Sequence, residues 1–191
     1  MRARLVPVVG LVSLLGLAGC GADSGTVAGA AKDGGRYVVA GGTIEKLPAA
    51  ERVTAIRVQG TTLEGKPLDT AEYAGQVVVI NTWGSWCPPC NAEARDLQRV
   101  YEQVRGDGVR FVGVNLRESA PAGQAFQRKY GITYPSVGNG TAIQPQLKGK
   151  AASTPTTLVL DRQGRLAARI SAQADATTLR TLISDVVKEA A

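Results

Sequence analysis

The chain has 191 residues, enough for one domain of ordinary size with appendages, and its 44% hydrophobic and 20% charged residues exclude a wholly disordered protein. It has no histidine, which excludes the commonest zinc, haem and copper ligand sets and every nucleophile that depends on a histidine base. The net charge is +6, but from Arg52 to Arg180 the arginines are scattered without a dense cluster, which argues against nucleic-acid binding.

The N-terminus has the features of a targeting segment. Two arginines precede an apolar run of 14 residues, Leu5–Ala18, which is shorter than the roughly 20 residues that span a bilayer and is typical of a signal peptide. The run ends in Leu17-Ala18-Gly19-Cys20, which resembles the lipobox of bacterial lipoproteins, where the cysteine is lipidated. An ordinary signal peptide with an incidental cysteine is the alternative.

A lipid on Cys20 would hold the protein on the extracytoplasmic face of a bacterial membrane, a compartment where disulfides persist. The sequence therefore predicts a lipoprotein signal peptide over 1–19, a flexible tether rich in Gly and Ala over 20–50, and one folded domain over 51–191. Within the tether only Tyr37–Val39 has the character of a short strand, which would dock on the edge of the domain.

From residue 52 onward the pattern alternates between strands and helices. Arg52–Gln59 is followed by turn-forming residues at Gly60 and Gly65–Pro67, which predicts an N-terminal hairpin. Val77–Ile80 is a continuous β-branched run, typical of a central strand that is buried on both faces. Hydrophobic spacing predicts the remaining elements: a helix over 88–105, a strand over 109–114, a helix over 122–130, strands over 156–160 and 165–170, and a helix over 176–189 capped by Asp175. This order predicts an α/β fold with one mixed central sheet flanked by helices.

The reactive chemistry of the sequence is concentrated at Trp86-Cys87-Pro88-Pro89-Cys90. Because the motif lies between a buried strand and a helix, Cys87 falls at the helix N-terminus, where free backbone N–H groups and the helix dipole favour a thiolate. Cys90 follows one helical turn later, where it can attack a mixed disulfide formed at Cys87.

Two alternatives to redox chemistry exist for this motif. A purely structural disulfide is one, although a bridge across so short a loop restrains the unfolded chain little. A zinc site is the other, but the sequence has no histidine and only Cys20 as a further cysteine, so it lacks the ligands. The motif therefore favours redox chemistry, with no metal.

The run Val77–Cys90 resembles the thioredoxin superfamily, and within it the TlpA/ResA/CcmG-like membrane-anchored thiol-disulfide oxidoreductases with a redoxin domain. The resemblance extends from about residue 55 to 190 and implies a thioredoxin-like fold with an N-terminal β-hairpin and a β-α insertion, which residues 117–145 would supply. It also implies that Thr154–Pro155 is a cis-proline loop that faces the disulfide and pairs with substrate backbone. A trans proline that merely opens the following strand is the alternative. Substrate contacts are expected at Trp86, Pro88, Thr154 and Pro155, whereas Trp83 is expected to pack beneath the active-site loop.

One carboxyl group stands out beside the cysteines. Glu93 follows Cys90 by three residues and can share a helix face with it. ResA-type proteins carry a glutamate at this position that is implicated in moving protons, so the resemblance implies that Glu93 accepts the proton of Cys90 as it attacks. The alternative is a first-turn glutamate that faces water and complements the helix dipole. Thioredoxin itself has a buried Asp six residues before the first cysteine, but here that position is Asn81, which cannot accept a proton.

The sequence thus predicts a lipid-anchored, extracytoplasmic thiol-disulfide oxidoreductase without a cofactor. The resemblance implies a reductase for cysteine-containing secreted clients, above all apocytochrome c during cytochrome c maturation, and a CcdA-like transmembrane protein as the electron donor. A disulfide-forming oxidase for secreted proteins is the alternative. A third hypothesis, from a different class, is a tethered binding or structural lipoprotein in which the Cys87–Cys90 bridge is inert.

Overall fold

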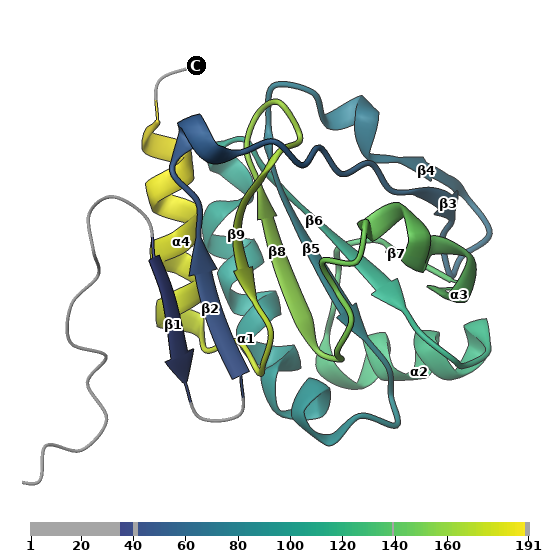
Figure 1. Ribbon diagram of the computed structural model, residues 1–191. Coiled ribbons are helices and arrows are strands. Elements are labelled where there is room, and N and C mark those ends of the chain that lie inside the picture. Colours follow the sequence, from purple (N-terminus) through teal and green to yellow (C-terminus); the bar gives the residue numbers. More distant parts are fainter. Residues whose placement is uncertain (1–34, 40–41, 139, 190–191) are drawn as a thin grey trace, which may run out of the picture. The chain divides into compact units, whose positions relative to one another are not determined.

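The computed structural model describes residues 35–39, 42–138 and 140–189, so the predicted signal peptide and Cys20 lie outside the described residues. The main sheet of the described part has seven strands in the order β1-β2-β9-β8-β5-β6-β7 (Figure 1). In that order they are β1 (Gly35–Val39), β2 (Gly42–Lys46), β9 (Leu166–Ile170), β8 (Thr156–Leu160), β5 (Val77–Trp83), β6 (Val109–Asn115) and β7 (Ser136–Val137). A separate hairpin pairs β3 (Gln59–Thr61) with β4 (Pro67–Asp69).

The described residues also form α-helices and short 3₁₀-helices. The α-helices are α1 (Pro88–Val104), α2 (Ala120–Tyr130), α3 (Gly140–Ile143) and α4 (Ala176–Lys188). The 3₁₀-helices are η1 (Ala49–Glu51), η2 (Thr70–Tyr73), η3 (Arg105–Asp107) and η4 (Gln144–Leu147).

Strand β5 is the centre of the fold and carries the chain into the cysteine motif. It pairs in parallel with β6 and antiparallel with β8, and all of its residues are buried. Side chains alternate between the two faces of a strand, so Val77 and Val79 point to one core and Val78 and Ile80 to the other. A strand buried on both faces and between two neighbours gives a fixed platform for the residues that follow it.

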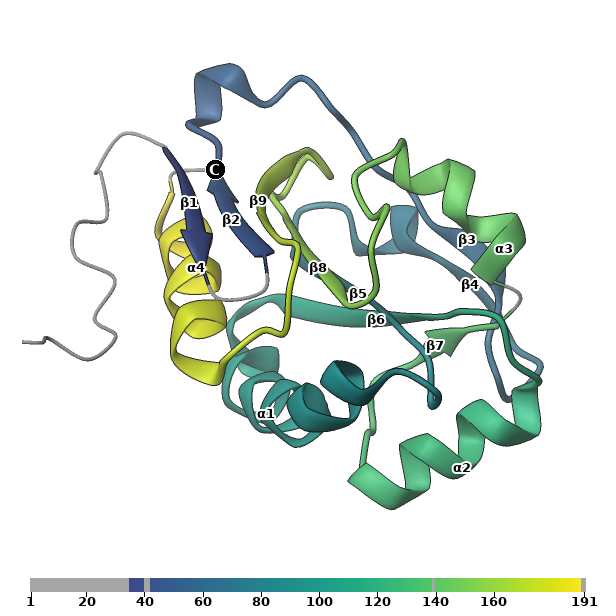
Figure 2. The same cartoon turned by 60° about the horizontal axis from the view of Figure 1, so that its bottom comes forward.

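Helices α1 and α4 pack together on one face of this sheet, as Figure 2 shows. Apolar side chains of both helices, Leu97 and Val100 of α1 and Leu179 and Ile183 of α4, pack against that face. Residues of the β4 hairpin and α3, Leu68 and Ile143 among them, cover the opposite face. Strand β5 thus lies between two apolar cores, and the residues at its end and at the start of α1 pack in a third, smaller cluster that contains Trp83, Cys87 and Cys90.

The predicted α/β class, mixed sheet and order of the elements are confirmed from β5 onward. Helix α1 ends one residue before the predicted boundary, as does α4, and α2 begins two residues earlier than predicted. The predicted cap of the last helix is present, since the Asp175 side chain accepts a hydrogen bond from the N–H of Thr178 at 2.9 Å. Residues 117–145 supply the insertion, which contains α2, the short strand β7 and α3.

The predicted start of the domain at residue 51 is too late. Residues 42–46 form β2, which pairs with β9, and residues 35–39 form β1 at the sheet edge, in agreement with the short edge strand predicted near Tyr37. The described part of the predicted tether therefore belongs to the domain. Strands at a sheet edge are held mainly by backbone pairing, so they need few of the large apolar side chains that mark a central strand.

The first strand of the predicted N-terminal hairpin is also misplaced. Most of 52–58 is irregular, with one isolated bridge between Ala55 and Arg165, and the paired strands are β3 and β4 instead. At the start of this segment the exposure is the opposite of what hydrophobicity predicts, because Arg52 is 4% exposed and Val53 is 90% exposed. The buried Arg52 guanidinium forms ion pairs with Asp161 and Glu189, which hold this segment against the end of α4.

Candidate active site

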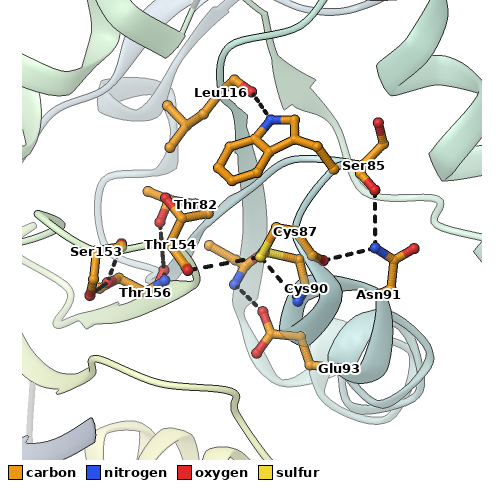
Figure 3. Close-up of a disulfide and its surroundings, with 12 residues drawn as sticks. Thr82, Ser85, Cys87, Cys90, Asn91, Glu93, Leu116, Ser153, Thr154 and Thr156 are labelled. Atoms are coloured by element: carbon orange, nitrogen blue, oxygen red, sulfur yellow. Dashed lines mark hydrogen bonds between the residues drawn. A yellow bond between two sulfur atoms is a disulfide. The ribbon is translucent and has the colours of Figure 1, made fainter. Parts of the chain in front are cut away.

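Cys87 and Cys90 lie where β5 passes into α1, and they are joined by a disulfide (Figure 3). Both cysteines are buried, whereas Trp86, Pro88 and Pro89 around them are exposed. Trp86 is 47% exposed, so a large apolar surface lies beside a buried reactive pair. The exposed indole therefore lies at the surface directly beside the buried disulfide.

Cys87 is the N-cap residue of α1, as the sequence predicts. The first two helical positions are Pro88 and Pro89, which have no backbone N–H to offer. The first available N–H of the helix, that of Cys90, donates to the Cys87 sulfur at 3.3 Å. This hydrogen bond and the dipole of α1 both favour negative charge on Cys87 once the disulfide is reduced.

The loop before β8 faces the disulfide. The Thr154–Pro155 peptide bond is cis, which confirms the prediction from family resemblance. The Cys87 sulfur lies 3.8 Å from the carbonyl oxygen of Thr154. Thr82 of β5 fixes the loop, because its hydroxyl oxygen accepts from the N–H of Thr156 at 3.1 Å. Thr154 is half-buried and Pro155 is buried, so the loop offers mainly backbone and the Thr154 side chain to a partner.

The loop between β6 and α2 forms hydrogen bonds to the residues just before Cys87. The Glu118 carboxylate accepts hydrogen bonds from the backbone N–H of Ser85 at 2.9 Å and from the Ser85 hydroxyl. The indole N–H of Trp86 donates to the carbonyl oxygen of Leu116 at 2.9 Å. These contacts fix the two residues that precede Cys87, including the orientation of the exposed indole.

Asn91 ties the start of α1 to the same loop. Its side-chain amide donates to the carbonyl oxygens of Ser85 at 3.0 Å and Cys87 at 2.8 Å. The Tyr130 hydroxyl of α2 donates to the Asn91 side-chain oxygen at 2.8 Å. Helix α2 is thereby connected to the N-terminus of α1, and the geometry of the dithiol loop depends on the insertion that carries α2.

Glu93 is fully buried on the face of α1 that points into the protein. One carboxylate oxygen accepts from the Asn81 side-chain amide at 2.9 Å, and the other accepts from the backbone N–H of Ala174 at 2.6 Å. The Asn81 amide also donates to the hydroxyl of Thr157 on β8 at 3.0 Å. This burial excludes the alternative in which Glu93 faces water.

Burial raises the pKa of Glu93 to about 7, because removal from water penalises the charged carboxylate more than its two hydrogen bonds stabilise it. A carboxyl group that titrates near neutral pH can both accept and return a proton under working conditions. The site therefore combines a cysteine pair at a helix N-terminus with a buried carboxyl group one turn along the same helix. This arrangement can carry out thiol-disulfide exchange coupled to proton transfer.

The structure brings the residues predicted from the cysteine motif together with those predicted from the cis-proline loop. Trp83 packs beneath the cysteine pair and stacks on Phe126 of α2 with ring centroids 4.5 Å apart, as expected. Sequence reasoning missed Glu118, Leu116 and Asn91. The sequence held one signal for Leu116 and Glu118. The order strand, helix, strand predicts that β5 and β6 are parallel, so the residues that follow β6 are expected to lie beside the residues that follow β5.

Within the described residues, no helix is long and apolar enough to cross a membrane. No group of three or more Cys, Asp and Glu side chains in this part of the chain is arranged to hold a metal ion.

Comparisons with known proteins agree with this geometry. A family model described as Redoxin matches residues 46–183. A DsbF homologue from Corynebacterium diphtheriae is similar in structure, with a TM-score of 0.69 and 36% identity over 74% of this chain and 92% of that one. A secreted thiol-disulfide isomerase from Corynebacterium glutamicum is similar with a TM-score of 0.70 and 31% identity, over 76% of this chain and 92% of that one.

A curated relative is the thiol-disulfide oxidoreductase ResA of Halalkalibacterium halodurans. It is 29% identical over 111 residues, which are 54% of this chain and 58% of the relative. The match thus spans less than two thirds of the length of that protein.

The buried carboxyl group gives a testable pH dependence of stability. In the unfolded chain Glu93 loses its proton near pH 4.5, whereas in the folded protein it keeps the proton to about pH 7. The folded state therefore binds more protons between these values, and the free energy of unfolding should fall by about 3 kcal/mol as the pH rises from about 4.5 to about 7. Glu93→Gln should remove this fall, as measured by denaturant unfolding of the oxidised protein at pH 5 and pH 8.

Glu102→Gln is the matched control, because Glu102 lies exposed on the same helix. This variant should keep the wild-type pH dependence. If Glu93→Gln and Glu102→Gln gave the same pH dependence as the wild type, the buried carboxyl group would not have a raised pKa.

Proposed function

The chain belongs to the Redoxin family, and on that premise we propose that it is a thiol-disulfide oxidoreductase whose reactive pair is Cys87 and Cys90. The observation that carries the proposal is the arrangement of this pair. It lies at the N-terminus of α1, against the cis Thr154–Pro155 loop, with the buried carboxyl group of Glu93 one turn along the helix. An inert structural bridge would need neither the buried carboxyl group nor the exposed apolar surface formed by Trp86 and Pro88.

In the reductive direction the reaction has two steps. The Cys87 thiolate attacks one sulfur of a client disulfide, which forms a mixed disulfide and releases the other client sulfur as a thiolate that takes up a proton. Glu93 then accepts the proton of Cys90, and the new thiolate attacks the Cys87 sulfur. The mixed disulfide breaks, the client leaves as a dithiol, and Cys87–Cys90 is left oxidised, so two electrons have passed to the client.

The exposed surface beside the disulfide is the proposed client-binding surface. The apolar faces of Trp86 and Pro88 would contact client side chains, and the backbone at Thr154 would pair with the extended client chain beside the reacting sulfur. Pro155 is buried beneath this backbone and would act by holding its direction.

Apocytochrome c is the proposed client, reduced before haem attachment, and the support for it is the resemblance to ResA- and CcmG-like proteins. Each turnover leaves the protein oxidised, so it needs a source of two electrons, for which we propose a CcdA-like transmembrane donor. The opposite direction, disulfide formation in secreted proteins, is the second candidate. It is supported by the similarity to a protein named a secreted thiol-disulfide isomerase.

The proposed location is the extracytoplasmic face of the membrane, with a lipid on Cys20 as the anchor. The support is the lipobox-like run before Cys20 and the similarity to a protein named as secreted. Cys20→Ala should move the protein from the membrane fraction to the soluble fraction of the producing cells. Continued membrane association of this variant would contradict lipidation at Cys20.

The roles of the two cysteines predict different outcomes for their variants. When the reduced protein is mixed with a peptide that carries a C-x-x-C-H disulfide, Cys90→Ala should accumulate a one-to-one mixed disulfide through Cys87, because the resolving thiol is missing. Cys87→Ala should form none. Glu93→Gln should form the mixed disulfide but resolve it more slowly than the wild type, because Cys90 has lost its proton acceptor.

Mass spectrometry of acid-quenched samples measures all three variants. Equal trapping by the two cysteine variants would overturn the assignment of Cys87 as the attacking residue. Resolution at the wild-type rate in Glu93→Gln would remove Glu93 from the mechanism.

A further inference from the structure

Arg117 has an unusual backbone conformation directly beside the active site. Its φ is 57°, in the left-handed region that favours glycine, and Arg117 and Lys148 are the two non-glycine residues with positive φ in the described part of the chain. A residue with a Cβ is less favourable than glycine in this conformation, so a large side chain at this position is energetically costly.

The residues on both sides of Arg117 fix its position. The carbonyl oxygen of Leu116 accepts from the Trp86 indole, and the Glu118 carboxylate accepts from the N–H of Ser85. Residue 117 is therefore held between two contacts to the active-site loop. Its guanidinium carbon lies 5.8 Å from the centroid of the Trp86 ring, within the range of a cation–π contact.

The charge of Arg117 is available to a partner molecule. The residue is exposed and forms no ion pair with any described residue. The neighbouring carboxylate of Glu118 is engaged by Ser85 and by the side-chain amide of Asn115. A guanidinium that lies over an aromatic ring keeps its N–H groups free at the edge, where they can bind a carboxylate in a bidentate manner.

We propose that Arg117 is a specificity-determining residue that binds a carboxylate of the client next to the cysteine that reacts with Cys87. The favoured client segment thus carries an Asp, a Glu or another carboxylate beside its disulfide. The apolar Trp86 ring and the Arg117 guanidinium form one composite surface, in which the ring contacts the client chain and the cation selects its charge. This inference rests on the proposed exchange reaction at Cys87 and adds the charge of its substrate.

The test compares two small disulfides of opposite character with the reduced full chain. One is 5,5′-dithiobis(2-nitrobenzoate), which carries a carboxylate on each ring, and the other is the neutral 4,4′-dithiodipyridine. The second-order rate constants are measured by stopped-flow absorbance at pH 7 and low ionic strength. The quantity of interest is the ratio of the anionic to the neutral rate constant, because a change in the reactivity of Cys87 itself would alter both rates together.

Arg117→Gln should lower this ratio on the order of tenfold, the loss expected for one charge-assisted hydrogen bond of about 1.4 kcal/mol. Arg95→Gln is the matched control, because Arg95 is also exposed and its guanidinium carbon also lies 5.8 Å from an aromatic ring, that of Tyr130. It removes the same charge from the protein and should leave the ratio at the wild-type value.

Arg117→Gly is a second variant that tests the same role if Arg117→Gln is unstable. Glycine suits the backbone at this position, so this variant should melt no lower than the wild type and yet lose the anionic preference. If the ratio stayed at the wild-type value in both variants, including the case in which both rate constants fell by the same factor, Arg117 would have no role in client selection. Failure of the wild type to react even with the neutral disulfide would instead contradict the proposed function.

Discussion

The N-terminus of α1 needs hydrogen-bond acceptors for its free backbone N–H groups, and the Cys87 sulfur is one of these acceptors. Because Pro88 and Pro89 donate nothing, the N–H of Cys90 is the first donor of the helix, and it points at that sulfur. The arrangement depends on β5, whose complete burial sets where the helix can begin. The sequence order of buried strand, short loop and helix thus places Cys87 at the N-terminus of α1 and Cys90 one turn further along the helix.

Three loops contact the residues around the Cys87–Cys90 disulfide. The β6–α2 loop binds the backbone before Cys87, the cis-proline loop lies against its sulfur, and the loop before α4 donates the N–H of Ala174 to Glu93. These segments are far apart in sequence, and the sheet brings them to one end of β5. Burial raises the pKa of Glu93 to about 7, and strongly shifted pKa values are more common at functional sites than elsewhere in proteins.

Much of this arrangement could be predicted from the sequence, and the exceptions have physical causes. The β-branched run of β5, the helical spacing of α1 and the cysteine motif are local signals, whereas the cis Thr154–Pro155 bond and the use of Glu93 came from family resemblance. Strand β2 was missed because backbone pairing near the edge of a sheet leaves little trace in side-chain hydrophobicity, whereas the edge strand β1 was anticipated at Tyr37–Val39. The burial of Arg52 could not be predicted because it depends on ion pairs with Asp161 and Glu189, which lie far along the chain. Glu118 was missed for the same reason, since its partner Ser85 is 33 residues away.

The measurement that tests the central claim most directly is the reduction potential of the Cys87–Cys90 pair, obtained by equilibration with defined thiol–disulfide buffers at pH 7. A reductase of client disulfides should have a potential near or below that of thioredoxin, about −270 mV. A value near about −120 mV, typical of a strong oxidant, would mean that the reduced form is the stable one. That result would contradict the reductive direction and favour disulfide formation in secreted proteins.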